Sequence, residues 1–200
     1  MVVRVTVSDA EKAKTDIAKA LSEFMTDQFV TIGIHEDAGQ HESDDINNAT
    51  LGAIHHFGAN IDHPGGTAYG FATQAAADRN EIRFLAEGEG FVELGRTGPH
   101  KINIPARPWL DVGVATGTEE YIKVIEQGIQ NGQNPGDLLN VLGVLAAGRA
   151  QLYMTNLRSP PNAASTIRRK GSSNPLIDSG ALRQSVTFKV TTGIPTEGLE

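Results

Sequence analysis

Residues 101–110 read KINIPARPWL, and this stretch divides the chain into two halves of different character. Residues 101–104 alternate between polar and apolar side chains, as a short strand does. Pro105 and Pro108 then fix their own φ angles and disfavour helix in the residues before them, so they form a rigid turn around Arg107 and Trp109. Short glycine-separated strands precede this turn, and helical periodicity follows it. We therefore expect an α+β fold, with a small, mainly antiparallel sheet flanked by helices.

The half after the turn is predicted to be mostly helical. Apolar residues at helical spacing indicate helices over residues 118–131 and 135–157. Residues 159–175 are rich in serine, proline and basic residues, which is typical of a loop. A short helix ending near Leu182 and a strand over residues 185–190 complete this half. Residues 193–200 are expected to form a flexible tail after a single domain of residues 1–192.

The half before the turn mixes both kinds of element. Ser8 and Glu11 have the spacing of a capping box, and an apolar stripe follows them to Met25, so we expect a helix there. Residues 29–35 are predicted to be a strand and residues 49–57 a helix ended by Gly58. Residues 59–71 contain a Pro-Gly-Gly run and are predicted to be a loop. Three short strands are expected over residues 81–85, 90–94 and 101–104, and they suggest a β-hairpin or a small meander. Residues 62–100 are expected to form an inserted, extended loop or hairpin.

Composition excludes several classes of protein. The chain has 200 residues and no cysteine, which rules out a disulfide scaffold, a thiolate metal site and a cysteine nucleophile. No apolar run approaches the roughly 18 residues of a membrane span, and the first residues lack the apolar core of a signal peptide. We expect a protein made in the cytoplasm that has no contact with membranes.

Charge is distributed unevenly along a chain of net charge −7. Residues 36–45 hold five acids and no lysine or arginine, whereas residues 138–177 hold five basic residues and no acid. Complementary patches of this kind suit head-to-tail association of identical copies. Two solvated surface regions remain the alternative interpretation.

Histidines and basic residues allow two other functions. The histidines His35, His41, His55, His56 and His63 fall within 29 residues, so a metal-dependent hydrolase using His35, His55 or His63 is one alternative. Against it, the chain has no HExxH motif, and neighbouring residues on a helix point about 100° apart. Arg168, Arg169 and Lys170 make a DNA-binding accessory protein the other alternative. We find no catalytic signature, and we predict no catalytic residue, metal or cofactor.

Three segments, taken in order, resemble the neck and tail-completion proteins of long-tailed bacteriophages. Residues 53–58 (AIHHFG) are similar to the family's short helix that ends in an aromatic residue and glycine. Residues 104–110 (IPARPWL) resemble its I-P-A-R-P-F-L, with Trp109 in place of the usual phenylalanine. Residues 175–186 (PLIDSGALRQSV) resemble its P-L-x-D-[ST]-G-x-L-x-x-S-[IV]. The insertion of residues 62–100 departs from the shortest members.

The resemblance implies a structural protein rather than an enzyme. Its copies would form a ring of six or twelve, as a head–tail connector or a tail terminator, between the phage head connector or adaptor and the tail tube or sheath. Genomic DNA would pass through the lumen without specific binding. The expected interface residues are Phe57, Arg107, Trp109, Arg168, Arg169 and Lys170, although Trp109 fits a core position equally well. The residues expected to face the lumen are Asp37, Glu42, Asp44 and Asp45. The protein would act in the virion neck or tail after assembly in the host cytoplasm.

Overall fold

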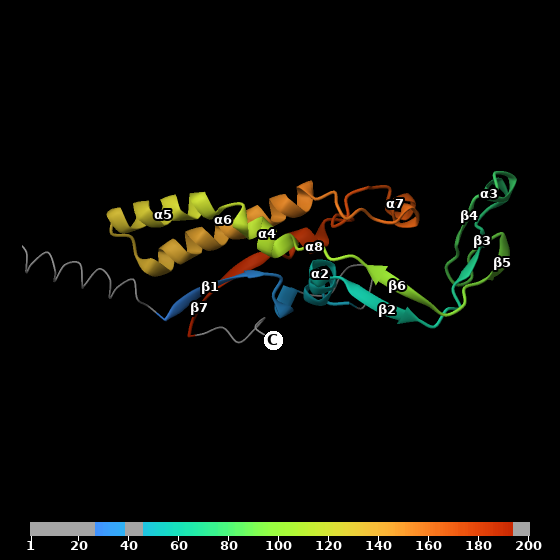
Figure 1. The fold of residues 1–200 in the computed structure, drawn as a ribbon, viewed down its shortest axis with the longest axis horizontal. Helices are drawn as coiled ribbons and strands as arrows, with labels where there is room; N and C mark the ends of the chain where they lie inside the picture. The colour runs from blue at the N-terminus through green and yellow to red at the C-terminus, as the bar shows by residue number, and fades with distance from the viewer. Residues whose placement is uncertain (1–26, 39–45, 194–200) are drawn as a thin grey trace, which may run out of the picture.

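The molecule is long and narrow, with a small sheet held away from the main body (Figure 1). The computed structural model describes residues 27–38 and 46–193. The strands are β1 (Gln28–Gly33), β2 (Ala59–His63), β3 (Ala68–Phe71), β4 (Ile82–Phe84), β5 (Val92–Arg96), β6 (His100–Ile104) and β7 (Thr187–Thr192). The helices are the short 3-10 helix η1 (Glu36–Ala38), α2 (Asn48–Phe57), α3 (Gln74–Asp78), α4 (Trp109–Ala115), α5 (Thr118–Gln130), α6 (Pro135–Asn156), α7 (Ala164–Lys170) and α8 (Ala181–Gln184).

All strand pairing in the described chain is antiparallel, and it forms three separate small sheets. β1 pairs with β7 inside the body, and β2 pairs with β6 as a two-stranded ribbon that leaves the body. The ribbon leads to the third sheet, in which β3 lies between β4 and β5. We call the ribbon and this third sheet, residues 59–104, the arm. The fold is α+β, with the arm in place of the expected inserted loop or hairpin.

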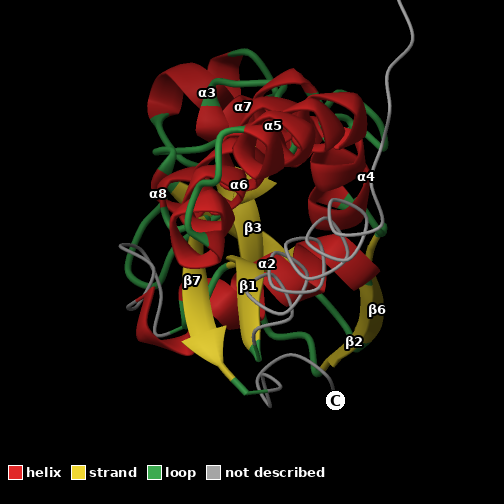
Figure 2. Ribbon diagram, turned by 90° about the vertical axis from the view of Figure 1, so that its left-hand side faces the viewer, coloured by secondary structure: helices red, strands yellow, loops and turns green. Residues whose placement is uncertain are grey.

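The core lies where α6 crosses the β1–β7 pair. Helices α5 and α6 lie on one side of these strands, as the end view shows (Figure 2). Small residues on α4 and α6 let the elements approach closely: a side chain at Gly143 on α6 would run into the ring of Phe188 on β7, and one at Gly113 on α4 would meet the backbone of Ala150 on α6. The buried cluster is Trp109, Ala147, Ala150, Met154, Leu157, Leu176, Leu182 and Val186.

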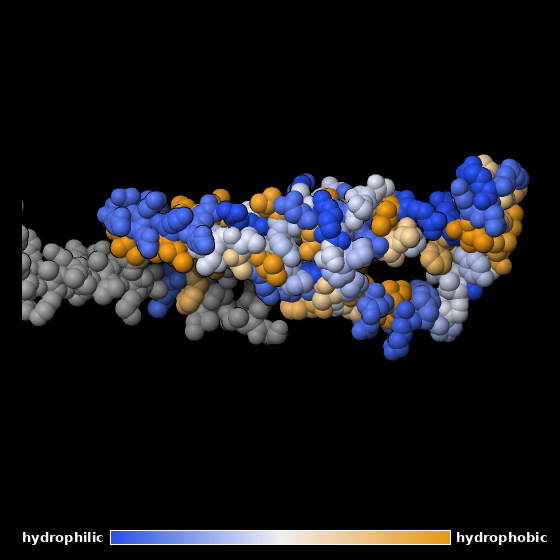
Figure 3. Space-filling view, turned by 45° about the horizontal axis from the view of Figure 1, so that its top comes forward, coloured by the Kyte–Doolittle hydropathy of each residue, from blue (hydrophilic) through white to orange (hydrophobic). Residues whose placement is uncertain are grey.

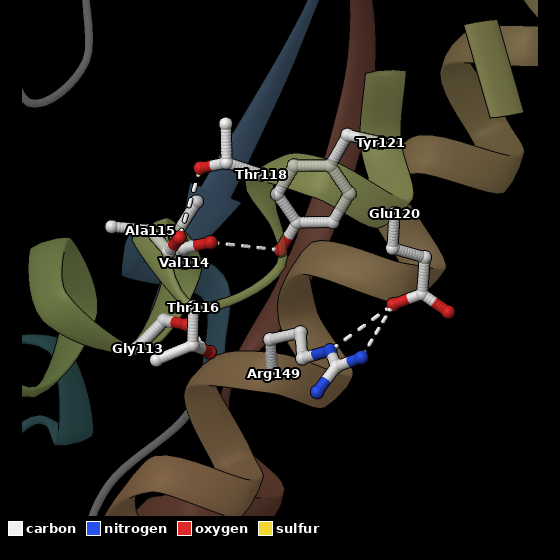
Figure 4. Close-up of polar contacts among 8 residues, drawn as sticks. All are labelled: Gly113, Val114, Ala115, Thr116, Thr118, Glu120, Tyr121 and Arg149. Carbon is white, nitrogen blue, oxygen red and sulfur yellow. Dashed lines mark hydrogen bonds and ion pairs between the residues drawn. The ribbon is translucent and has the colours of Figure 1, made fainter. Parts of the chain in front are cut away.

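Polar contacts join helix α5 to α4 and α6 (Figure 4). The Tyr121 hydroxyl donates a hydrogen bond of 2.9 Å to the carbonyl of Val114 at the end of α4. Arg149 on α6 donates to Glu120 over 2.7 Å. Both side chains of this ion pair are about two-fifths exposed, so solvent screens it and it contributes little to stability.

The helices predicted over residues 49–57, 118–131 and 135–157 are confirmed. Asn47 begins α2 by accepting the Ala49 amide at 2.7 Å, and Asn134 begins α6 in the same way, followed by Pro135 in the first turn. Helix α5 matches its predicted range to within one residue. Among the described residues, no helix is long and apolar enough to cross a membrane.

Other predictions of local structure need correction. Residues 59–71 are not a loop: they form β2 and β3, and only residues 64–67 connect the two strands. Strands β4 and β5 both pair with β3 rather than with each other, so they do not form the expected hairpin. Helix α7 lies within residues 159–175, which were expected to be loop. The predicted helix over residues 8–25, and residues 194–200 of the predicted tail, lie outside the described residues.

Candidate assembly surfaces

The three segments that resemble the phage family pack against one another. The Trp109 indole Nε1 donates to the Gly52 carbonyl at 3.1 Å, and the Arg107 amide donates to the His55 carbonyl at 2.8 Å. Gly58 lies so close to the Ile104 carbonyl that a Cβ there would be only 2.7 Å from it, and its φ of 77° also favours glycine. Leu176, Leu182 and Val186 from the third segment belong to the same core as Trp109. Apart from the exposed Phe57, these motifs therefore pack inside the protein.

Arg107 lies inside the protein, which corrects its expected role at an interface. Its side chain is only 2% exposed. Its guanidinium donates to the carbonyls of Pro160 and Pro161 and to Asn162 Oδ1, over 2.9 to 3.3 Å. Burial lowers the pKa of Arg107 below its usual value. Arg107 therefore fastens the loop after α6 to the turn before α4, and it presents no group to a neighbouring molecule.

Trp109 is likewise a core residue, so the choice left open by the sequence is decided. Its ring is 3% exposed and contacts His56 edge to face, with ring centroids 5.9 Å apart. The His56 ring in turn lies 3.3 Å from Asp111 and accepts the Leu110 amide. This cluster joins the C-terminal end of α2 to the start of α4.

Phe57 lies on the surface of the protein, as a residue at an interface must. It ends α2 with its side chain 77% exposed, the largest exposure among the exposed large apolar residues of the described chain. Its ring rests only edge to face on His56, with centroids 4.5 Å apart.

The basic residues expected at an interface lie in the last turn of α7. Arg168 and Arg169 are exposed, whereas Lys170 is half-buried and donates to the Asn174 carbonyl at 2.9 Å. Burial lowers the pKa of Lys170, and nearby Asp178 opposes that shift. Arg168 and Arg169 are therefore the exposed members of this group. The hydrogen bond from Arg79 lowers the pKa of Glu81 on the arm, and the charge of Arg168 adds to this shift.

The acidic residues expected to face a lumen are only partly described. Asp37 is exposed and pairs with Lys189 on β7 at 3.1 Å, and this hydrogen bond lowers the pKa of Asp37. Glu42, Asp44 and Asp45 lie outside the described residues.

The histidines are dispersed over different contacts. His35 lies 3.1 Å from the Thr31 hydroxyl, and His55 lies 3.4 Å from the Arg107 guanidinium. His63 is on the arm, where its ring lies 4.9 Å from that of His100 across the ribbon. Burial, and then the charge of Arg107, lower the pKa of His55 to about 4. No three ligand-type side chains come together within the described chain, and His41 lies outside it.

The arm carries an apolar surface that the sequence reasoning missed. The strand register places Tyr69, Phe71, Ile82, Phe84 and Val92 on one face of the three-stranded sheet. Ile82, Phe84 and Val92 are 45%, 59% and 40% exposed. Figure 3 shows apolar side chains gathered on this end of the molecule. Alternation along β4 and β5 was the available signal, but it does not reveal whether a strand's apolar side faces a core or the solvent.

The ribbon of β2 and β6 also carries exposed apolar side chains, although fewer of them. Ile61 and Ile102 are paired across β2 and β6, and both side chains are exposed. A two-stranded ribbon is marginally stable in water unless another element covers one of its faces.

Comparison with known proteins adds no relative. No family model, no curated protein and no solved structure matches this chain.

Proposed function

We propose that this chain is a structural protein of the neck of a long-tailed bacteriophage, where copies of it form a ring between head and tail. The ring would hold six or twelve copies and would complete the head connector or terminate the tail tube. Its partners would be further copies of itself, the connector or adaptor of the head, and the tube or sheath of the tail. DNA would cross the lumen without being bound, and the role would be structural rather than catalytic.

The observation that carries this proposal is the arm. A chain of this size ordinarily uses its apolar side chains to fill its own core, and large contiguous apolar patches mark surfaces that bind another molecule. Here residues 59–104 project from the body and hold Ile61, Phe84 and Val92 in solvent. Such an arm becomes stable when another molecule covers its apolar face, and in a larger assembly a neighbouring subunit does so.

The motif segments support the family resemblance in a second way. They come from three distant parts of the sequence, and they meet around Trp109 and Arg107. A likeness in segments that mostly pack together is what we expect of proteins that share a core. The surfaces that would decide the position of the protein in the neck lie outside this packed core, at exposed Phe57 near the end of the first segment, at Arg168 and Arg169, and on the arm.

The acidic residues would serve the passage of DNA. Asp37, together with Glu42, Asp44 and Asp45, would line the lumen and repel the phosphate backbone during ejection. Replacing all four by their amides should slow genome release, as measured by dye uptake into DNA leaving the virion. Unchanged ejection kinetics would contradict this lining role and would leave the ring itself unaffected.

Electron microscopy of lysates made with the gene blocked tests the proposal. Full heads beside separate tails of normal length indicate a joining protein, and overlong tails indicate a terminator. Intact infectious virions would refute the proposed function.

A further inference from the structure

Helix α6 carries an apolar stripe that faces away from the core. Val141, Val144, Gly148 and Leu152 follow one another at spacings of three or four residues, so they lie on one side of the helix. The side chains of Val141, Val144 and Leu152 are 45%, 60% and 51% exposed. A long helix with apolar residues all round is normally buried on every side, so we expect another protein surface to cover this side of α6.

Gly148 marks a notch in the middle of this stripe. It lies inside a helix of 22 residues, where glycine is less stable than alanine. Nothing in the described chain requires a glycine there, because an added Cβ would have no other atom within 4 Å. Beside it lies an open hollow of about 440 Å³ between α6 and α8, lined by Gly148, Gln151, Leu152, Thr155, Arg183 and Gln184. Because the glycine has no side chain and the hollow is open, a side chain of another molecule has room to enter there.

Charge indicates what covers this stripe. Arg183 donates to the Thr155 hydroxyl, and Arg158 donates to two backbone carbonyls. Among the described residues, no carboxylate pairs with either arginine, and residues 138–177 contain no acid. The sheet at the end of the arm has the opposite balance: residues 78–96 hold five acids and three arginines. Its arginines pair with Glu81, Glu89 and Glu93, so among the described residues Asp78 and Glu87 are the acids of this sheet that have no basic partner. The two surfaces are therefore complementary in charge, and both are apolar at their centres.

We propose that the apolar face of the arm sheet in one copy docks on the α6 stripe of a second copy, with Phe84 entering the hollow over Gly148. This inference rests on the proposed function, because the occupant is another copy of the same chain. The arm and the stripe are well separated within one molecule, so each copy offers one surface to each of two neighbours (Figure 1). Contacts between two different surfaces of identical subunits are head-to-tail, and they close into a ring when the rotation per subunit allows it.

Cross-linking tests the contact directly, because the natural chain has no cysteine. One preparation carries Gly148→Cys and another carries Phe84→Cys, and the two are mixed before a short bismaleimide is added. We expect covalent dimers in the mixture and about tenfold fewer in either preparation alone. A matched mixture of Gln130→Cys and Phe84→Cys, with the new thiol on an exposed residue of α5, should give few dimers.

A second variant separates this contact from the proposed function. Gly148→Trp fills the notch and should lower the affinity between copies by about tenfold or more, while the circular-dichroism spectrum and thermal midpoint stay those of a folded chain. Gln130→Trp should assemble normally. If rings still form with Gly148→Trp, and if the mixture of Gly148→Cys and Phe84→Cys gives no covalent dimer, this interface is refuted and the proposed function stands. A natural chain that is monomeric at every concentration would contradict both.

Discussion

Replacing Arg107 by methionine should destabilise the protein strongly, although the substitution touches no apolar contact of the core. The change keeps most of the length of the side chain and removes its donors. The carbonyls of Pro160 and Pro161 lose bonds of 2.9 and 3.2 Å, and Asn162 Oδ1 loses one of 3.3 Å. All three acceptors lie in one loop, and among the described residues no other side-chain hydrogen bond joins that loop to the turn before α4.

The magnitude follows from the burial of the group. A hydrogen bond from a charged donor contributes about 1.5–3 kcal/mol, and the two carbonyl bonds together give roughly 3–6 kcal/mol. Relief from burying a charge that has no carboxylate partner offsets part of this loss. We therefore expect Arg107→Met to lower the free energy of unfolding by about 2–4 kcal/mol.

Urea unfolding followed by tryptophan fluorescence measures this effect, because the only tryptophan of the chain, Trp109, lies two residues away in the same core. Arg158→Met is the matched control: its guanidinium is exposed and bonds only to nearby carbonyls, so its effect should stay within about 0.5 kcal/mol. If Arg107→Met unfolds within about 0.5 kcal/mol of the natural chain, our interpretation of Arg107 as a buried fastener is wrong.

Three further predictions concern His55, Gly143 and Phe57. The pKa of His55 is lowered from 6.5 to about 4 in the folded chain, so the contribution of this group to stability is full above pH 6.5 and falls by about 3 kcal/mol as the pH drops toward 4. Urea titrations at several pH values should show that His55→Asn removes this part of the dependence of stability on pH. An unchanged dependence would contradict the prediction. Gly143→Ala should lower the thermal midpoint, because its methyl group would run into the ring of Phe188, and an unchanged midpoint would show that the ring moves aside freely. Phe57→Ser should leave the free energy of unfolding within about 0.5 kcal/mol of the natural value while it weakens association in sedimentation equilibrium, and equal association would remove Phe57 from the interface.

Local signals predicted the helices well because their causes are local. Apolar residues at helical spacing indicated α5 and α6, and Gly58 indicated the end of α2. The capping asparagines before α2 and α6 are equally local signals, which the prediction did not use. The arm was missed for the opposite reason. Residues 59–63 become a strand by pairing with residues 100–104, some forty positions later, and the Pro-Gly-Gly run between β2 and β3 made the whole stretch resemble a loop.

The candidate surfaces were harder to predict than the fold. Arg107 stands between two prolines, and arginine is a residue type favoured at interfaces, so the sequence suggested a partner in another molecule. Only the positions of Pro160 and Asn162 reveal that its partners lie within the same chain. The stripe on α6 is the reverse case. Val144 and Leu152 have the helical spacing of core residues, and the sequence does not show that β1 and β7 cover only the other side of the helix. The sequence shows which apolar and charged side chains require a contact partner, and the tertiary structure shows which of them have that partner within the same chain.

Native mass spectrometry of the purified chain, with electron microscopy of the same sample, tests the central claim most directly. Our account predicts closed rings of six or twelve copies that dissociate when Gly148 is replaced by tryptophan. Monomers at every concentration, or open filaments that never close, would contradict it.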